Sequence, residues 1–140
     1  MNTYQEFKRI KMDRTSQRQW VVKVIYQIEF YDIDKIEIDE ILDNHEIKEF
    51  SFIQSSVRSI VENMEEIDQI ISDNLYNWNI KRIPLMDKAI LRVAINEFVI
   101  QKSVPTSVAI NEAVENAKLF SNAESYKFIN GVLSSISKGI

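Results

Sequence analysis

Apolar residues recur every three or four positions through most of this chain, which is the spacing of one face of a helix. The first such stripe consists of Val21, Val24, Ile25 and Ile28. Ser16, followed by Gln19, precedes this stripe and has the spacing of a capping box. The pattern therefore predicts an amphipathic helix that begins near Ser16 and presents one apolar face to a core.

The middle of the chain continues the helical spacing in shorter pieces. Residues 32–43 form a short acidic amphipathic segment, and Asn44 and His45 form the break after it. A clear helical pattern runs over residues 47–64, and its stripe continues over residues 67–75, in the same helix or in a separate one. The polar run at residues 77–79 predicts a break there.

The last third predicts three more helices, at about residues 84–98, 109–117 and 123–137. Pro84 suits a first helical turn, where its missing N–H costs nothing, and Asp87 there complements the helix dipole. The stripe at residues 109–117 is rich in alanine and permits close packing, within the chain or in a homodimer. Gly131, inside the last helix, predicts a close approach by another backbone.

The composition agrees with an all-helical fold of one domain. The 140 residues include two glycines, two prolines and no cysteine. So few turn formers disfavour an all-β fold, and the lack of cysteine excludes disulfides and thiolate metal sites. We expect a basic tail at residues 1–12 and a helical domain at residues 13–140. We also expect a cytoplasmic protein with no membrane span, because no apolar run is long enough.

Charge is distributed unevenly along the chain. Residues 1–23 carry six basic and two acidic side chains, a net charge of +4. Residues 24–80 carry 3 basic and 14 acidic side chains, a net charge of −11, and residues 81–140 have a net charge of +3. Such asymmetry fits a molecule with one anion-facing surface, although it is also common in proteins that simply solvate a charged face.

The sequence offers no candidate catalytic, metal or cofactor site. Two isolated glycines cannot form a glycine-rich phosphate loop, and the single histidine, His45, is interpreted as a surface residue. The acidic segment lacks the glycine that a calcium loop needs at its sixth position, which is Glu37. The pattern from Ser135 to Lys138 fits the S-x-x-K motif of some acyl-enzymes, but it has no partner motif. We therefore expect a binding protein with no cofactor and no metal.

Two long ordered strings in the last third carry a resemblance to a known family. One reads Val-Pro-Thr-Ser-Val-Ala-Ile-Asn-Glu-Ala at residues 104–113, and the other reads Lys-Phe-Ile-Asn-Gly-Val-Leu at residues 127–133. The run Asp-Lys-Ala-Ile-Leu-Arg-Val-Ala at residues 87–94 precedes them. In these strings the chain resembles the NusB family of transcription antitermination factors. The first helix resembles the family more loosely, and residues 32–80 resemble it only in pattern.

The resemblance implies an all-α fold of about seven helices in two small packed bundles. It also implies binding of boxA-type single-stranded RNA together with the ribosomal protein NusE. That complex helps RNA polymerase to resist termination, especially on ribosomal RNA operons. Some members of the family form dimers, so a homodimer is possible.

Site residues are carried over from the family by position. Arg14 and Arg18 match its arginine-rich helix start, which contacts RNA phosphates, and Lys127 and Phe128 match a basic–aromatic pair near the RNA. Two further residues match positions at or beside the surface for RNA and the ribosomal protein. They are Tyr26, expected to meet RNA or NusE, and Asp87, expected to meet the protein partner.

The chain departs from the family where a denser arginine run is usual. Residues 15–17 are Thr, Ser and Gln at that place. Lys8, Arg9 and Lys11 lie upstream and are expected to supply RNA contacts from the tail. Two other interpretations stay open: a helical protein-interaction module without RNA binding, and an unrecognised enzyme.

Overall fold

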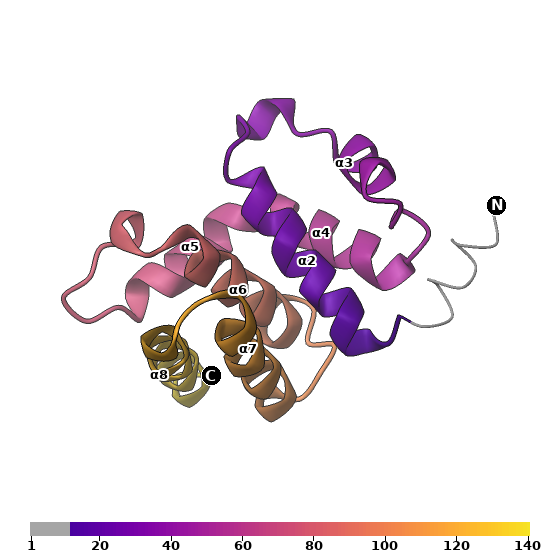
Figure 1. Cartoon of the computed structure of the whole chain (residues 1–140). Coiled ribbons are helices and arrows are strands. Elements are labelled where there is room, and N and C mark those ends of the chain that lie inside the picture. Colours follow the sequence, from indigo (N-terminus) through magenta and orange to yellow (C-terminus); the bar gives the residue numbers. More distant parts are fainter. Residues whose placement is uncertain (1–11) are drawn as a thin grey trace.

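The computed structural model describes residues 12–140, which form α-helices joined by short connections (Figure 1). The seven α-helices of this part are α2 (Arg14–Ile28), α3 (Ile38–Asn44), α4 (Ser51–Glu62), α5 (Met64–Asp73), α6 (Leu85–Ile95), α7 (Thr106–Phe120) and α8 (Ala123–Lys138). Two 3-10 turns, Ile33–Lys35 and Ile80–Arg82, and a π-helical turn, Asn96–Ile100, complete the regular structure. The expected all-α fold is confirmed for the described residues.

Helix α2 begins two residues earlier than the sequence pattern predicts. Asp13 is its N-cap, and its carboxylate accepts a hydrogen bond from the Ser16 backbone N–H at 2.8 Å. The prediction of a capping box from Ser16 to Gln19 was wrong, because an acidic side chain three residues before Ser16 already satisfies that donor. This hydrogen bond, together with one from the Ser16 side chain, lowers the pKa of Asp13.

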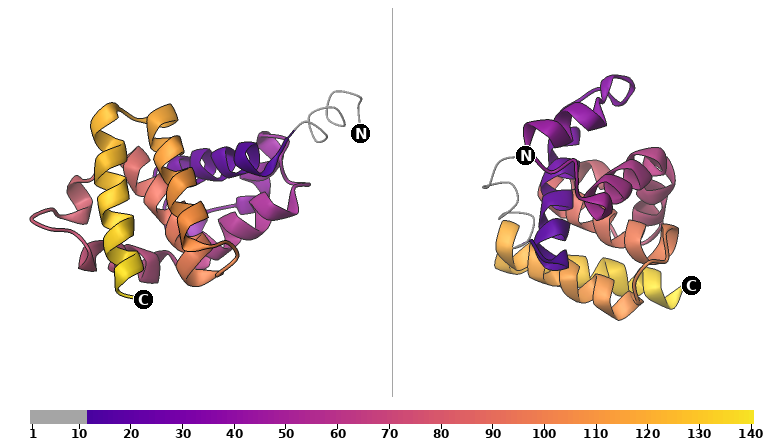
Figure 2. Two further views of the ribbon diagram at one scale, coloured as in Figure 1. Left: turned by 90° about the horizontal axis from the view of Figure 1, so that it is seen from below. Right: turned by 90° about the vertical axis from the view of Figure 1, so that its right-hand side faces the viewer.

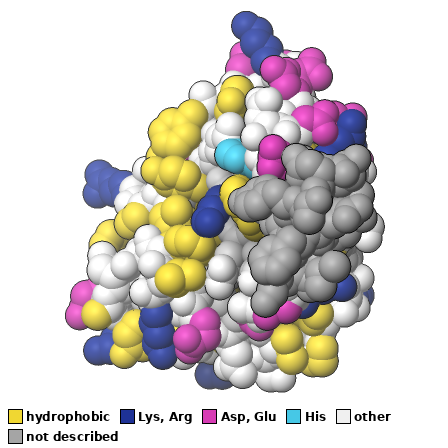
Figure 3. Space-filling model, turned by 45° about the vertical axis from the view of Figure 1, so that its right-hand side comes forward, with side chains coloured by type: hydrophobic (Ala, Val, Ile, Leu, Met, Phe, Trp, Pro, Cys, Tyr) yellow, Lys and Arg dark blue, Asp and Glu magenta, His cyan; other side chains and the backbone are white. Residues whose placement is uncertain are grey.

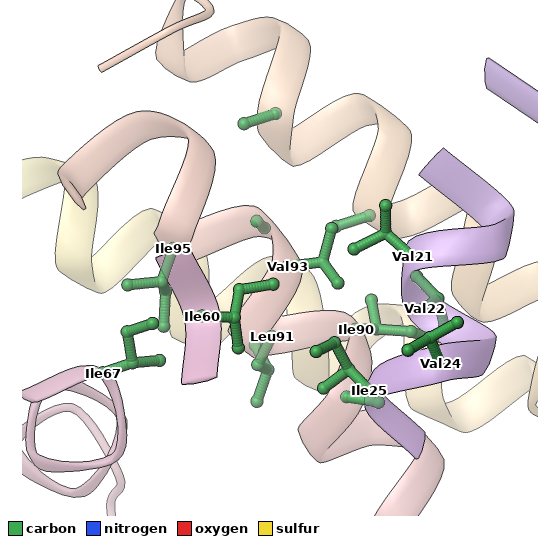
Figure 4. Close-up of a cluster of buried hydrophobic side chains, with 14 of the residues drawn as sticks. Val21, Val22, Val24, Ile25, Ile60, Ile67, Ile90, Leu91, Val93 and Ile95 are labelled. Atoms are coloured by element: carbon green, nitrogen blue, oxygen red, sulfur yellow. The ribbon is translucent and has the colours of Figure 1, made fainter. Parts of the chain in front are cut away.

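Helix α6 is the centre of the fold. All nine of its residues from Asp87 to Ile95 are buried, and the helix contacts α2, α4, α5, α7 and α8. Its apolar side chains meet those of α2, α4 and α5 in one continuous cluster, part of which is drawn in Figure 4. A helix that is buried on all sides needs apolar residues on every face, which explains why its sequence lacks a single stripe.

The two halves of the chain meet at α6. Helices α7 and α8 pack along each other on one side of it, whereas α2 and α4 lie on the other, as the two views of Figure 2 show. The division of the fold into two bundles remains a prediction, because α6 belongs to the core of both halves.

The alanine stripe of α7 is buried by packing within the chain. Ala109, Ala113 and Ala117 are at most 3% exposed and belong to the hydrophobic core. A second copy of the chain cannot reach them, so they lend no support to the possible homodimer.

Gly131 lies on the exposed side of α8, and the prediction of a close backbone approach there was wrong. A Cβ added at this position would meet no atom within 4 Å. The glycine thus leaves a bare stretch of helix surface.

Buried charges tie α6 to its neighbours. Arg92 donates two hydrogen bonds of 2.8 Å to Asp68 on α5 and a third, of 2.6 Å, to Glu29 at the end of α2. Lys88 adds a 3.1 Å bond to the same Glu29. Partial burial would raise the pKa of Glu29, but the hydrogen bonds and charges of Arg92 and Lys88 outweigh it and lower that pKa. Likewise, burial opposes the charge of Arg92, yet Asp68 and Glu29 raise its pKa.

Candidate nucleic-acid interface

The first part of the candidate site lies at the start of α2. Arg14 is exposed, and its guanidinium carbon lies 4.1 Å from the centre of the Phe52 ring on α4. Stacking on an aromatic face restricts the arginine and keeps its donors available at the surface. Beside it is an open hollow of about 700 Å³. Its lining consists of Arg14, Arg18, Ser51, Phe52, Ser55, Ser56, Gln101, Ser103 and Val104. Hydroxyls beside a guanidinium suit a phosphate group.

Arg18 has a different role from the one expected for it. Its side chain is 4% exposed and donates two hydrogen bonds, of 2.7 and 2.8 Å, to the two carboxylate oxygens of Glu97. A third nitrogen lies 3.4 Å from Glu112. Burial would lower the pKa of Arg18, but its pairing with Glu97 and Glu112 raises that pKa, so the group stays charged. Phosphate binding by Arg18 does not fit this geometry, because its guanidinium is already engaged by carboxylates.

A π-helical turn makes this buried pair possible. Glu97 lies in the turn Asn96–Ile100 and is 1% exposed. Turns of this kind insert one extra residue and rotate the following side chains inward or outward. No sequence pattern predicts the turn, so the pairing of Arg18 with Glu97 could not be predicted.

Three predicted contacts cannot be placed. Lys8, Arg9 and Lys11 lie outside the residues that the structure describes, and their RNA contacts stay a prediction.

The second part of the site is built around Phe128 on α8. Its half-buried ring meets the ring of Trp78 at a centroid distance of 6.3 Å and an angle of 61°. Trp78 is 60% exposed, and Lys127 is exposed beside the pair. The sequence analysis treated residues 77–79 only as a break and missed Trp78. A tryptophan in a polar break between helices has few core neighbours, and that could have identified it as a surface aromatic.

Two hollows flank the Trp78–Phe128 pair. The first, of about 350 Å³, is lined by Trp78, Ile83, Pro84, Asp87, Asn122, Glu124, Ser125 and Phe128. The second, of about 330 Å³, is lined by Asn74, Leu75, Tyr76, Trp78, Lys127, Phe128, Gly131 and Val132. Each offers aromatic surface next to polar groups, the combination that holds an unpaired base.

Asp87 borders the first hollow but is itself 2% exposed. Its carboxylate accepts a 2.8 Å hydrogen bond from the Ser121 hydroxyl, which lies 2.8 Å from the hydroxyl of Ser125. The carboxylate thereby fixes the turn between α7 and α8. Direct contact of Asp87 with a protein partner stays a prediction, and its burial favours a positioning role.

Tyr26 belongs to a third region, at the end of α2. It is half-buried, and its ring meets the ring of Phe30 edge-on at 5.4 Å. Phe30 is 65% exposed and Tyr31 is 46% exposed, so this end of α2 presents apolar aromatic surface. The structure thus brings Lys127, Phe128 and Asp87 together around one aromatic pair, and places Arg14 and Tyr26 at two other points.

The described residues hold no other evident chemical site. Within residues 12–140, no three His, Cys, Asp or Glu side chains are grouped so that they could hold a metal ion. His45 is half-buried, with its Nε2 2.8 Å from the Gln27 side-chain oxygen and its ring 5.2 Å from that of Trp20. It therefore packs against Trp20 and Gln27 while staying partly exposed at the surface. No helix in this part of the chain is long and apolar enough to span a membrane.

The family model, the related sequences and the solved structures all indicate the same family. The model of the NusB family matches residues 15–138. The transcription antitermination protein NusB of Bacillus pumilus is 40% identical over 126 residues, covering 89% of this chain and 95% of the relative. Its counterpart in one Bacillus cereus strain is 41% identical over 127 residues, covering 89% and 97%.

Solved structures agree with these sequences. NusB of T. maritima superimposes with a TM-score of 0.78 at 33% identity, covering 91% of this chain and 92% of that one. A crystal structure of the antitermination factors NusB and NusE in complex with double-stranded RNA gives a TM-score of 0.78 at 26% identity, covering 91% and 97%. With its fold, its motifs and nearly its whole length in agreement, the chain belongs to the NusB family.

Proposed function

We propose that this protein is a transcription antitermination factor that binds boxA-type single-stranded RNA together with NusE and supports ribosomal RNA transcription. It would act in the cytoplasm as part of the RNA polymerase antitermination complex. The observation that carries the proposal is the grouping of exposed Lys127 with the Trp78–Phe128 ring pair between two hollows. Membership of the NusB family and the likeness to a solved complex of NusB, NusE and double-stranded RNA support RNA and NusE as the partners.

The proposed RNA contacts divide into two kinds. Arg14 and Lys127 would neutralise phosphates, which supplies affinity without sequence preference. Phe128 and Trp78 would stack on unpaired bases, and stacking of this kind contributes about 1–3 kcal/mol per base. Because single strands expose both their bases and their phosphates, this combination favours single-stranded over duplex RNA.

The end of α2 is the proposed contact for NusE. Phe30 and Tyr31 expose aromatic surface next to Tyr26, and aromatic residues are enriched in the buried centres of protein interfaces. Asp87 would contribute indirectly, since it holds the turn before α8 through Ser121 and so shapes the first hollow. The role assigned to the protein needs no catalytic residue.

The direct test is binding of a labelled boxA-like single-stranded RNA, with and without NusE, over a series of salt concentrations. We expect tight binding that weakens as salt rises and strengthens when NusE is present. A scrambled single strand and a duplex of the same sequence serve as controls and should bind more weakly. Absence of salt-dependent binding, even with NusE, would leave the alternative of a protein-interaction module without RNA binding.

A further inference from the structure

Two lysines outside the predicted site are held over aromatic rings. The Nζ of Lys23 on α2 lies 4.6 Å from the centre of the Trp20 ring and 5.7 Å from that of Phe120, at the end of α7. The Nζ of Lys118 lies 5.2 Å from the centre of the Tyr126 ring at the start of α8. Both lysines are exposed, whereas the three rings are half-buried. The rings thus form a fixed support, and the ammonium groups face solvent.

These lysines lie on α2 and α7, and the contact of Lys118 is next to the proposed RNA surface on α8. Lys23 follows Arg14 by nine residues, or about two and a half turns of α2, so it lies about 14 Å further along the helix and on its opposite side. The ring beneath Lys118 belongs to Tyr126, the residue directly before Lys127. Figure 3 shows this face as a band of hydrophobic side chains with a basic group among them, near the single histidine. The contact of Lys23 with the Phe120 ring places this part of α2 beside the end of α7.

The arrangement favours phosphates as the ligand over stacked bases. In each half-buried ring an ammonium group already lies over one face, which leaves less of the ring for a base to stack on. A lysine restrained by a cation–π contact loses less side-chain freedom when it binds an anion than an unrestrained lysine does. Glu115, whose carboxylate lies 3.4 Å from Lys118, is an exposed partner, and exposed pairs of this kind are weak and screened by salt.

We propose that Lys23 and Lys118 form a phosphate-binding track, which binds the backbone of a single RNA strand on its way to Lys127. The proposal rests on the proposed RNA binding and adds two contacts to it. The rings of Trp20, Phe120 and Tyr126 act as positioning residues, because they hold the ammonium groups and do not touch the RNA.

The test compares three double variants with the unmodified protein, each in complex with NusE and a labelled boxA-like single strand over a salt series. Lys23→Gln with Lys118→Gln should lower the slope of log affinity against log salt by about 1.4, which is about 0.7 for each lost contact. Lys23→Arg with Lys118→Arg should keep the slope, because arginine retains the charge and also stacks on rings. Lys35→Gln with Lys138→Gln removes the same charge elsewhere and should leave the slope close to that of the unmodified protein.

The outcomes separate the two proposals. If the unmodified protein shows no salt-dependent RNA binding, the proposed function and the track both fail. If it binds, but the Lys23 and Lys118 glutamine variant keeps the full slope, only the track is overturned. If that variant instead loses affinity for NusE measured without RNA, the surface contacts protein and the track is likewise overturned. Unchanged thermal unfolding of the glutamine variant would show that the fold is intact.

Discussion

Arg14 and Arg18 lie one helical turn apart on α2 and carry the same guanidinium group, yet the fold uses them in opposite ways. Arg14 lies at the surface on the Phe52 ring, with its donors available to an anion. Arg18 is buried and paired with Glu97 through two hydrogen bonds. The same contrast holds for α6 and α8: Lys88 and Arg92 are buried in a charge network, whereas Lys127 is exposed. Burial thus decides which basic residues stabilise the protein and which can bind.

Removing each arginine separately tests most directly whether Arg18 stabilises the protein and Arg14 does not. Arg18→Met should cost about 3–5 kcal/mol of unfolding free energy, because it leaves the buried Glu97 carboxylate without its partner. Arg14→Met, at the surface, should change stability by no more than about 0.5 kcal/mol. Denaturant unfolding of both variants measures the difference. Equal effects on stability would contradict the division of roles.

A substitution at Phe128 tests whether the surface aromatic pair binds RNA. Phe128→Leu keeps an apolar side chain in the half-buried position but removes the aromatic face next to Trp78. We expect single-stranded RNA affinity to fall by about 1–3 kcal/mol, the contribution of one stacked base. Titration with the boxA-like strand measures this loss. Phe30→Leu, which removes an exposed aromatic ring at the end of α2 by the same substitution, serves as the matched control in titrations without NusE.

The buried charge network predicts a dependence of stability on pH. The folded-state pKa of Glu29 is lower than its ordinary value of 4.5, so its ionised form stabilises the fold above about pH 4.5. That contribution should be lost as the pH falls through the folded-state pKa. Unfolding measured from pH 7 downward should therefore show a shallower decline for Glu29→Gln than for the unmodified protein. Parallel curves would mean that Glu29 is not coupled to folding.

Gly131 tests whether the exposed surface of α8 is open. Because nothing lies within 4 Å of an added Cβ, Gly131→Ala should stabilise the protein by about 1 kcal/mol. A thermal unfolding series checks the sign. A decrease in stability would show that the helix surface there is not open.

The sequence allowed the helices and the family to be predicted, because both depend on local patterns. The periodic stripes placed the helices close to their observed positions, although Asp13 and not Ser16 caps α2. The burial and the contacts of Arg18, Asp87 and the alanine stripe could not be predicted, since they depend on which helices meet. Glu97, in the π-helical turn, is far from Arg18 in the sequence, and Ser121 is far from Asp87. The positions of Lys23 and Lys118 over aromatic rings could not be predicted either. Phe120, for example, lies near Lys23 only in the folded chain.

The most direct test of the account is the salt dependence of RNA binding by Arg14→Gln combined with Lys127→Gln, measured with NusE alongside thermal unfolding of the same variant. The account predicts a slope of log affinity against log salt that is lower by about 1.4, because two exposed phosphate contacts are lost. It also predicts an unfolding temperature close to that of the unmodified protein, because neither side chain is buried. An unchanged slope, or a slope that falls only because the protein unfolds, would contradict the claim that the exposed basic residues bind RNA.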